Sequence, residues 1–137
     1  MKALKWTLRN KRGQASFEVA IAVILLIALL LFAWDMTMIG YNWPALQFAV
    51  NEGLRAGAQS SAFDAGEIEN YTRTIAKRFG IADPNVVATF AGGMVSVRAE
   101  KTVPFTPLTK TIFQLSGLGD GFTVYASGQR SQEPGGV

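Results

Sequence analysis

The feature that most constrains this chain is an uncharged apolar run at residues 19–34, which reads VAIAVILLIALLLFAW. As a helix, this run would be about 24 Å long, a little less than the roughly 30 Å hydrocarbon core of a bilayer. Phe17 before it and Met36 after it extend the apolar stretch, and Trp34 suits the outer membrane–water interface. We therefore expect one membrane-spanning helix near the start of the chain.

Charge is distributed unevenly around this run. Residues 1–13 contain five basic residues and no acidic residue: Lys2, Lys5, Arg9, Lys11 and Arg12. By the positive-inside rule the N-terminus is then cytoplasmic, and the residues after the helix lie across the membrane. Without those five of its thirteen basic residues the chain has eight basic and ten acidic residues, a net charge of −2. The overall charge of +3 therefore indicates membrane topology and not a nucleic-acid-binding surface.

Two carboxylates bound the apolar run. Glu18 stands alone at its cytoplasmic edge, where a charge is costly, so it is a functional candidate, with a tolerated interfacial residue as the alternative. We expect Asp35 at the level of the outer headgroups, with pairing inside a filament as the alternative. A further interpretation is that the basic N-terminal residues and the apolar run form a membrane anchor that is not cleaved. A secretory signal peptide is disfavoured, because its apolar region is about 7–15 residues long and ends in a small-x-small cleavage site.

Composition argues against an enzyme. The chain has no His and no Cys, which excludes disulfides, thiolate chemistry, catalytic triads that use either residue, and His-ligated metals. Glu67 and Glu69 are two residues apart on an expected helix and do not face each other. Neither a Gly-rich phosphate loop nor a nucleophile elbow is present. We therefore expect a protein without catalytic activity, cofactor or metal.

The segment after the apolar run is also helical in character. Pro44 has no N–H to give to Gly40, so we expect the helix to kink or restart between them and to resume over residues 45–58. Small residues recur every four positions on this second part: Ala45, Ala49, Gly53 and Gly57. Such a face either allows the backbone of another subunit to approach or packs locally on the protein's own head domain.

The remaining residues predict a small α+β head. Asp64 and Glu67 form a capping box for a second helix that ends near Gly80. Its apolar stripe, which we expect in the core, comprises Ile68, Tyr71, Ile75 and Phe79. Three antiparallel strands follow at residues 85–90, 94–104 and 122–127, with a Gly-rich hairpin turn at 91–93 and a short amphipathic piece between Pro107 and Gly117. From Gly128 we expect a frayed tail.

One stretch resembles a known processing site. In R-G-Q-A-S-F-E at residues 12–18, a cut after Gly13 would make Glu18 the fifth residue of the mature chain, as in type IV prepilins. The apolar helix and F-A-V-N-E-G-L-R-A-G-A at 48–58 follow, and this order resembles TadE-like pseudopilins. Gln14 after the cut, where the commonest type IV pilins have Phe, favours the TadE-like branch. The resemblance is specific over residues 12–58 and weaker beyond them.

The resemblance implies a minor pseudopilin of a tight-adherence (Flp-type) type IV pilus system, acting in pilus assembly or adhesion. It implies that a prepilin peptidase cuts after Gly13, that Gln14 supplies the new α-amine, and that Glu18 pairs with the amine of a neighbouring subunit. The interface helix would use Ala49, Gly53 and Gly57. The expected binding partners are other pilin or pseudopilin subunits and the inner-membrane assembly platform.

The expected organisation is a cleaved leader at residues 1–13, a transmembrane helix at 14–43 and an extracytoplasmic head at 44–137. The protein would cross the bacterial inner membrane once, with its N-terminus cytoplasmic, and would enter the fibre or stay in the membrane. The alternative function is an uncleaved membrane-anchored adaptor or sensor with a small extracytoplasmic domain.

Overall fold

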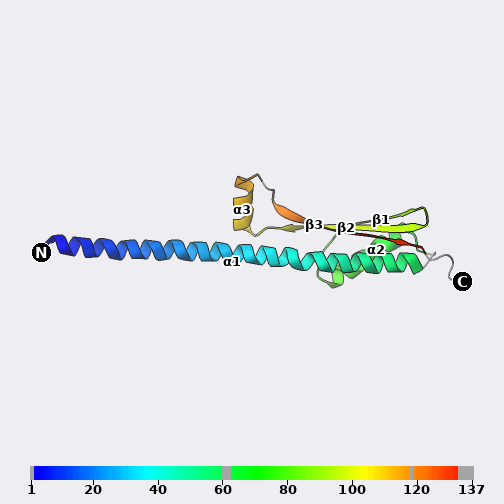
Figure 1. Cartoon of the computed structure of the whole chain (residues 1–137), viewed down its shortest axis with the longest axis horizontal. Coiled ribbons are helices and arrows are strands. Elements are labelled where there is room, and N and C mark those ends of the chain that lie inside the picture. The colour runs from blue at the N-terminus through cyan, green and yellow to red at the C-terminus, as the bar shows by residue number, and fades with distance from the viewer. Residues whose placement is uncertain (1, 60–62, 118, 133–137) are drawn as a thin grey trace.

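The computed structural model describes residues 2–59, 63–117 and 119–132, with side chains described from Gly13 onward. Its helices are α1 (Lys2–Gln59), α2 (Ala65–Arg78) and α3 (Pro107–Leu115). Its strands are β1 (Asn85–Ala91), β2 (Met94–Pro104) and β3 (Gly121–Ser131). Figure 1 shows α1 as one long helix with the small head packed along its C-terminal half. The predicted α+β architecture, a long N-terminal helix followed by a second helix and a three-stranded antiparallel sheet, is confirmed.

Of the predicted kink or restart of α1 before Pro44, the restart is wrong, because one helix continues through Pro44. A proline inside a helix removes one backbone hydrogen bond and strains the preceding turn. Here the head holds the helix on both sides of the proline. Before it, Tyr41 Oη donates to the carbonyl oxygen of Phe79 at 3.1 Å, and after it the side chain of Leu46 is completely buried. These contacts outweigh the local preference for a break.

The sheet is antiparallel in the order β1-β2-β3, and β2 pairs along its whole length with β3. Gly92 and Gly93 join β1 to β2 with φ angles of 58° and 75°, which only glycine adopts readily and which suit a two-residue hairpin turn. The expectation of a frayed tail from Gly128 is wrong up to Ser131. These residues are ordered in β3 because the long central strand offers them backbone partners, from Val97 opposite Gly128 to Met94 opposite Ser131.

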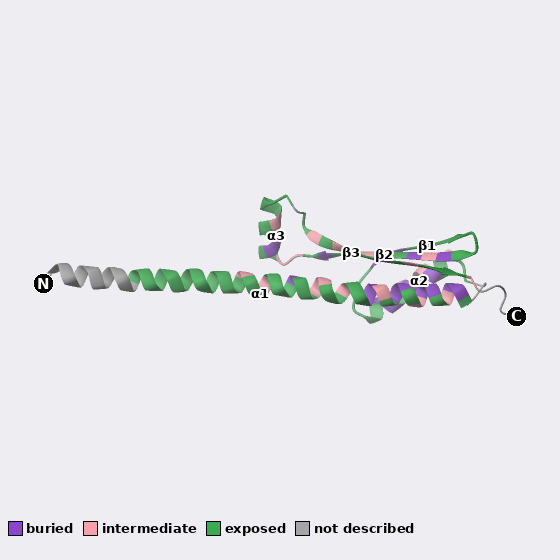
Figure 2. Ribbon diagram, in the orientation of Figure 1, coloured by how far each residue is buried: buried purple, intermediate pink, exposed green. Residues whose placement is uncertain are grey.

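The core lies between one face of the sheet and the two helices beneath it. The buried sheet residues alternate along the strands: Val86, Ala88, Val95, Val97, Ala99, Val103, Val124 and Ala126. Their counterparts on α1 are Leu46, Ala49, Val50 and Leu54. Figure 2 shows that burial along α1 is concentrated in its C-terminal half. The head is therefore built on α1 and does not form a separate body beyond it.

The small-residue face of α1 packs inside this core. A Cβ atom on Gly53 would lie 2.1 Å from Thr72 Oγ1 of α2, and one on Gly57 would lie 2.6 Å from Ile68 Cδ1. Ala49 is completely buried as well. The structure therefore supports local packing, the second interpretation of this face. Ala49, Gly53 and Gly57 are interior positions that bring α1 and α2 close together, rather than a surface presented to another subunit.

Helix α2 begins as predicted but presents a different face. Asp64 accepts from the Glu67 N–H at 2.8 Å, and Glu67 accepts in return from the Asp64 N–H at 3.2 Å, which completes the capping box. The predicted stripe is wrong at two of its four positions, because Tyr71 and Phe79 are each 38% exposed. The buried residues of α2 are Ile68 and Ile75, as predicted, together with the smaller Thr72 and Ala76 in place of the two aromatic residues. The close approach of α1 at Gly53 leaves no room there for an aromatic ring.

Candidate functional site

The candidate processing site lies on consecutive turns of α1. Gly13, Gln14 and Glu18 are all exposed, and Gln14 Nε2 donates to Glu18 Oε1 at 3.3 Å across one turn. A Cβ atom at Gly13 would meet nothing within 4 Å, so the fold does not require glycine at this position. Helical propensity even disfavours it, since glycine costs about 1 kcal/mol relative to alanine inside a helix. Neither packing among the described residues nor helical propensity accounts for a glycine at position 13.

Beyond Glu18, α1 carries a bare apolar surface. Among the described residues one helix, Gly13–Gln59, is long and apolar enough to cross a membrane, and none of its most apolar window is buried within the chain. Side chains such as Leu25 and Leu29 are about two-thirds exposed. Soluble monomers rarely expose contiguous apolar surface of this extent. The length and composition of this part of α1 suit a membrane anchor.

The two carboxylates that bound this surface lie in different environments. Glu18 and Asp35 are about 26 Å apart along the helix axis, close to the thickness of a hydrocarbon core. Glu18 is exposed, and among the described side chains no cation lies within ion-pair distance of it. Asp35 is only 3% exposed. The residues proposed for an interface, Ala49 to Gly57, begin about 47 Å from Glu18 along α1, so the structure does not bring them near Glu18.

Asp35 holds the start of α3. Its Oδ1 accepts the Thr106 N–H at 3.1 Å, and its Oδ2 accepts the Thr106 hydroxyl at 3.0 Å. Because that hydroxyl donates to Asp35, the contact between Thr106 Oγ1 and Thr109 Oγ1 at 3.1 Å uses Thr109 as the donor. A carboxylate at a helix N-terminus also interacts favourably with the helix dipole. Asp35 is thus a structural tie within the chain, which neither of the two sequence-based interpretations included.

Sequence reasoning missed this contact for a physical reason. Thr106 followed by Pro107 is a recognisable helix start, and Thr106 is indeed the N-cap of α3. The Thr106 side chain, however, makes no capping hydrogen bond of its own, and the acceptor comes from a residue 71 positions earlier in the chain. No local pattern links the two positions.

Asp35→Ala is expected to lower the free energy of unfolding by about 1–3 kcal/mol, because the Thr106 N–H and the Thr106 hydroxyl lose their acceptor in a partly buried place. Asp35→Asn keeps one acceptor oxygen, so its effect should be smaller. The measurement is chemical denaturation of the full chain in detergent, with hydrogen exchange across α3. Thr111→Ala, an exposed change on α3, is the matched control and should stay within about 0.5 kcal/mol of wild type. Equal stability of Asp35→Ala and this control would contradict the tie.

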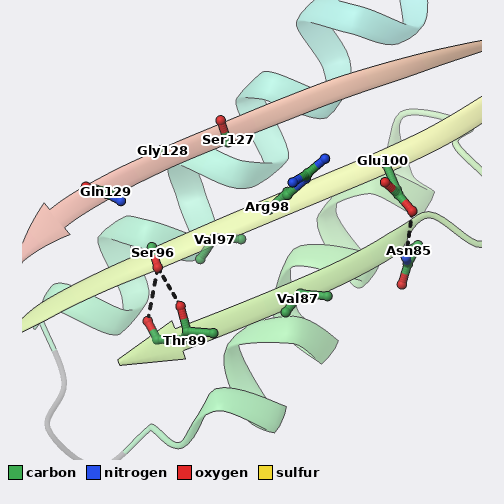
Figure 3. Close-up of a pocket in the computed structure, with 10 residues that line it drawn as sticks. All are labelled: Asn85, Val87, Thr89, Ser96, Val97, Arg98, Glu100, Ser127, Gly128 and Gln129. Atoms are coloured by element: carbon green, nitrogen blue, oxygen red, sulfur yellow. Dashed lines mark hydrogen bonds between the residues drawn. The ribbon is translucent and has the colours of Figure 1, made fainter. Parts of the chain in front are cut away.

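The face of the sheet turned away from the helices is a polar, open hollow (Figure 3). Its side chains bond mainly with one another: Thr89 Oγ1 lies 2.6 Å from Ser96 Oγ, and Asn85 Nδ2 donates to Glu100 Oε1 at 2.8 Å. Arg98 lies over the ring of Tyr125, 5.4 Å from its centroid. Within the described part of the chain no group of three or more His, Cys, Asp or Glu side chains is placed to hold a metal ion.

The comparisons with known proteins bear on the N-terminal part of the chain. A family model described as TadE-like protein matches residues 13–55, which include Gly13, Gln14 and Glu18, the apolar run and the first part of the head-binding face of α1. The resemblance inferred from the sequence is therefore confirmed over this segment. No curated protein and no solved structure matches the chain.

Proposed function

We propose that this chain, which matches the TadE-like family model over residues 13–55, is a minor pseudopilin of a tight-adherence (Flp-type) pilus system. One observation carries the proposal: a single exposed helix holds Gly13, which the fold does not need, then Glu18, then an apolar surface that no described part of the chain covers. An anchor alone requires only the apolar surface. A pseudopilin requires all three, at this spacing.

The proposed mechanism is non-enzymatic. A prepilin peptidase cuts after Gly13 and frees the α-amine of Gln14, which in the uncut chain is an amide inside α1. The amine of one subunit then pairs with Glu18 of a neighbour inside the membrane or the fibre. A buried carboxylate without a counter-charge is expensive, whereas a paired one is much less so, so the pairing checks the register between subunits. The Gln14 amide orients the Glu18 carboxylate from one turn away.

The remaining parts support this role. The head lies at the end of α1 opposite the basic leader, so the positive-inside rule places it on the extracytoplasmic side of the inner membrane. There it is available to other pilin or pseudopilin subunits and to the membrane-embedded assembly platform. The protein is held in the membrane by α1 until it enters the fibre or primes its assembly.

Deletion of the gene in the native bacterium tests the proposal. We expect surface pili to be lost or strongly reduced and to return with the wild-type gene. A gene carrying Gly13→Arg should fail to restore them although its product accumulates in the membrane. The measurement is pilus yield after shearing, beside immunoblots of the membrane fraction. Normal pilus number and surface attachment in the deletion strain would rule out a role in this system.

A further inference from the structure

Helix α3 has an apolar side that nothing in the described chain covers. Leu108, Ile112 and Leu115 are 39%, 51% and 86% exposed, and their spacing places them on one side of the helix, which we name the outer face of α3. An 86% exposed leucine makes almost no contact with the rest of the protein. The outer face therefore lacks an occupant in the isolated chain.

The place of α3 along α1 limits what this occupant is. Asp35 holds Thr106, so α3 starts at the level where the uncharged run of α1 ends. Figure 1 shows α3 crosswise to α1 and set apart from the other elements of the head, on the side nearer the N-terminus. If α1 crosses a bilayer, a helix that leaves it crosswise at this level extends along the membrane surface.

The orientation of α3 turns the outer face toward the membrane. Phe113 stacks on Phe105, which follows directly after β2, with ring centroids 4.8 Å apart and planes inclined by 19°. The Phe113 side of α3 therefore faces the sheet. At about 100° per residue, Leu115 lies about 200° and Leu108 about 140° around the helix from Phe113, so both are directed away from the sheet. The sheet lies beside α1 between the level of α3 and Gln59 (Figure 1). A side chain of α3 that points away from the sheet therefore points toward the apolar run of α1.

The polar side of α3 is anchored elsewhere. Lys110 Nζ lies 3.1 Å from Asp120 Oδ2, and Gln114 Nε2 donates to Asp120 Oδ1 at 2.5 Å. Hydrogen bonds from Gln114 and Lys110 hold the pKa of the Asp120 carboxyl below its usual value, so the group stays ionised at neutral pH. Lys110 and Gln114 lie about 200° and 240° around the helix from Leu108, opposite the outer face. This division into an apolar and a charged side is typical of helices that lie in a membrane interface.

We propose that α3 lies in the outer interface of the bilayer that α1 crosses, with Leu108, Ile112 and Leu115 inserted among the lipid chains. The inference rests on the proposed function, because it requires α1 to span that bilayer. The occupant is lipid rather than a second protein, since the outer face adjoins the part of α1 that itself needs lipid. The Asp35–Thr106 tie then fixes the depth of the head relative to the membrane surface.

Site-directed spin labelling tests the proposal, and the cysteine-free sequence makes single-cysteine variants straightforward. The full chain is reconstituted at low protein density in vesicles of phosphatidylcholine and phosphatidylglycerol. A nitroxide is attached at Leu115→Cys on the outer face, Lys110→Cys on the opposite side and Thr89→Cys on the open face of the sheet. Leu26→Cys reports on the span itself. Collisional accessibility to oxygen and to a water-soluble nickel complex gives the depth at each position.

We expect position 115 to favour oxygen over nickel, at a depth of roughly 5–10 Å below the headgroups, and positions 110 and 89 to favour nickel. Position 26 should lie deeper than 115. If 26 is in the bilayer but 115 is in water, the interfacial helix is overturned and the span stands. If 26 is also in water, the membrane anchoring in the proposed function fails, and this inference fails with it. Protection of 115 from both reagents only at high protein density would identify another subunit as the occupant and overturn the lipid proposal.

Discussion

Glu18→Gln is expected to leave the protein inserted and processed but to prevent its assembly. The amide has almost the size of the carboxylate and lacks its charge, so the α-amine of a neighbouring subunit would enter the interface unpaired. Truncating one member of a buried ion pair costs about 3–5 kcal/mol, which corresponds to a loss of assembly affinity on the order of 10²–10⁴-fold. The measurement is the amount of protein in sheared pili or in subunit crosslinks, divided by the amount of mature protein in the membrane.

Two variants control this experiment. Glu18→Asp keeps the charge and shortens the reach, so we expect it to impair assembly less than the amide does. Glu100→Gln makes the same chemical change on the open face of the sheet, where the side-chain oxygen still accepts from Asn85, and should assemble normally. Wild-type assembly by Glu18→Gln would show that the carboxylate has no pairing role and is a tolerated residue at the membrane edge.

Leu46→Ala is expected to lower the free energy of unfolding by about 2–5 kcal/mol, a large share of the stability of a small domain. Leu46 is completely buried, and it holds α1 in the core directly after Pro44. Its loss would both leave a cavity and release the strained turn around the proline. Chemical denaturation of the full chain in detergent, followed by far-UV circular dichroism, measures the effect.

Phe79→Ala is the matched control, because it removes a larger side chain from a half-exposed position. Phe79 packs edge-on against Phe48, with ring centroids 5.2 Å apart, and Phe48 is itself 48% exposed. Such a pair contributes about 0.5–1.5 kcal/mol beyond its buried area, and the Phe79 ring leaves no enclosed cavity when it is removed, so we expect a smaller loss than at Leu46. A loss at Phe79 as large as that at Leu46 would restore the apolar stripe predicted from the sequence and contradict the core described here.

The features that local patterns encode were predictable. The capping box needs only Asp64 and Glu67 three residues apart, and the hairpin needs only two glycines that accept positive φ angles. The inward face of β2 follows from the alternation of side chains along a strand. Lys101 belongs to this face, and its half-buried side chain donates a hydrogen bond to the Ala82 carbonyl oxygen. Each of these depends on residues that are neighbours in the sequence or adjacent on the hairpin.

The features that were missed depend on contacts between distant segments. The predicted core face of α2, with Tyr71 and Phe79, and the observed one, with Thr72 and Ala76, differ by a small rotation of the helix. The close approach of α1 at Gly53 selects the observed face. The continuity of α1 at Pro44 depends on contacts with the head on both sides, and the burial of Asp35 depends on Thr106. In each case tertiary packing outweighs a local preference that favours another arrangement.

The mass of the mature protein shows whether the chain is cut after Gly13. The full chain is expressed with an active prepilin peptidase, recovered from membranes and measured by intact mass spectrometry with N-terminal sequencing. A pseudopilin is predicted to begin at Gln14, with the leader removed, and to stay full-length when the peptidase is inactive or when Gly13 is replaced by Arg. Recovery of only the full-length chain beside an active peptidase, which processes a known prepilin in the same cells, would contradict the account and favour an uncleaved membrane-anchored adaptor or sensor.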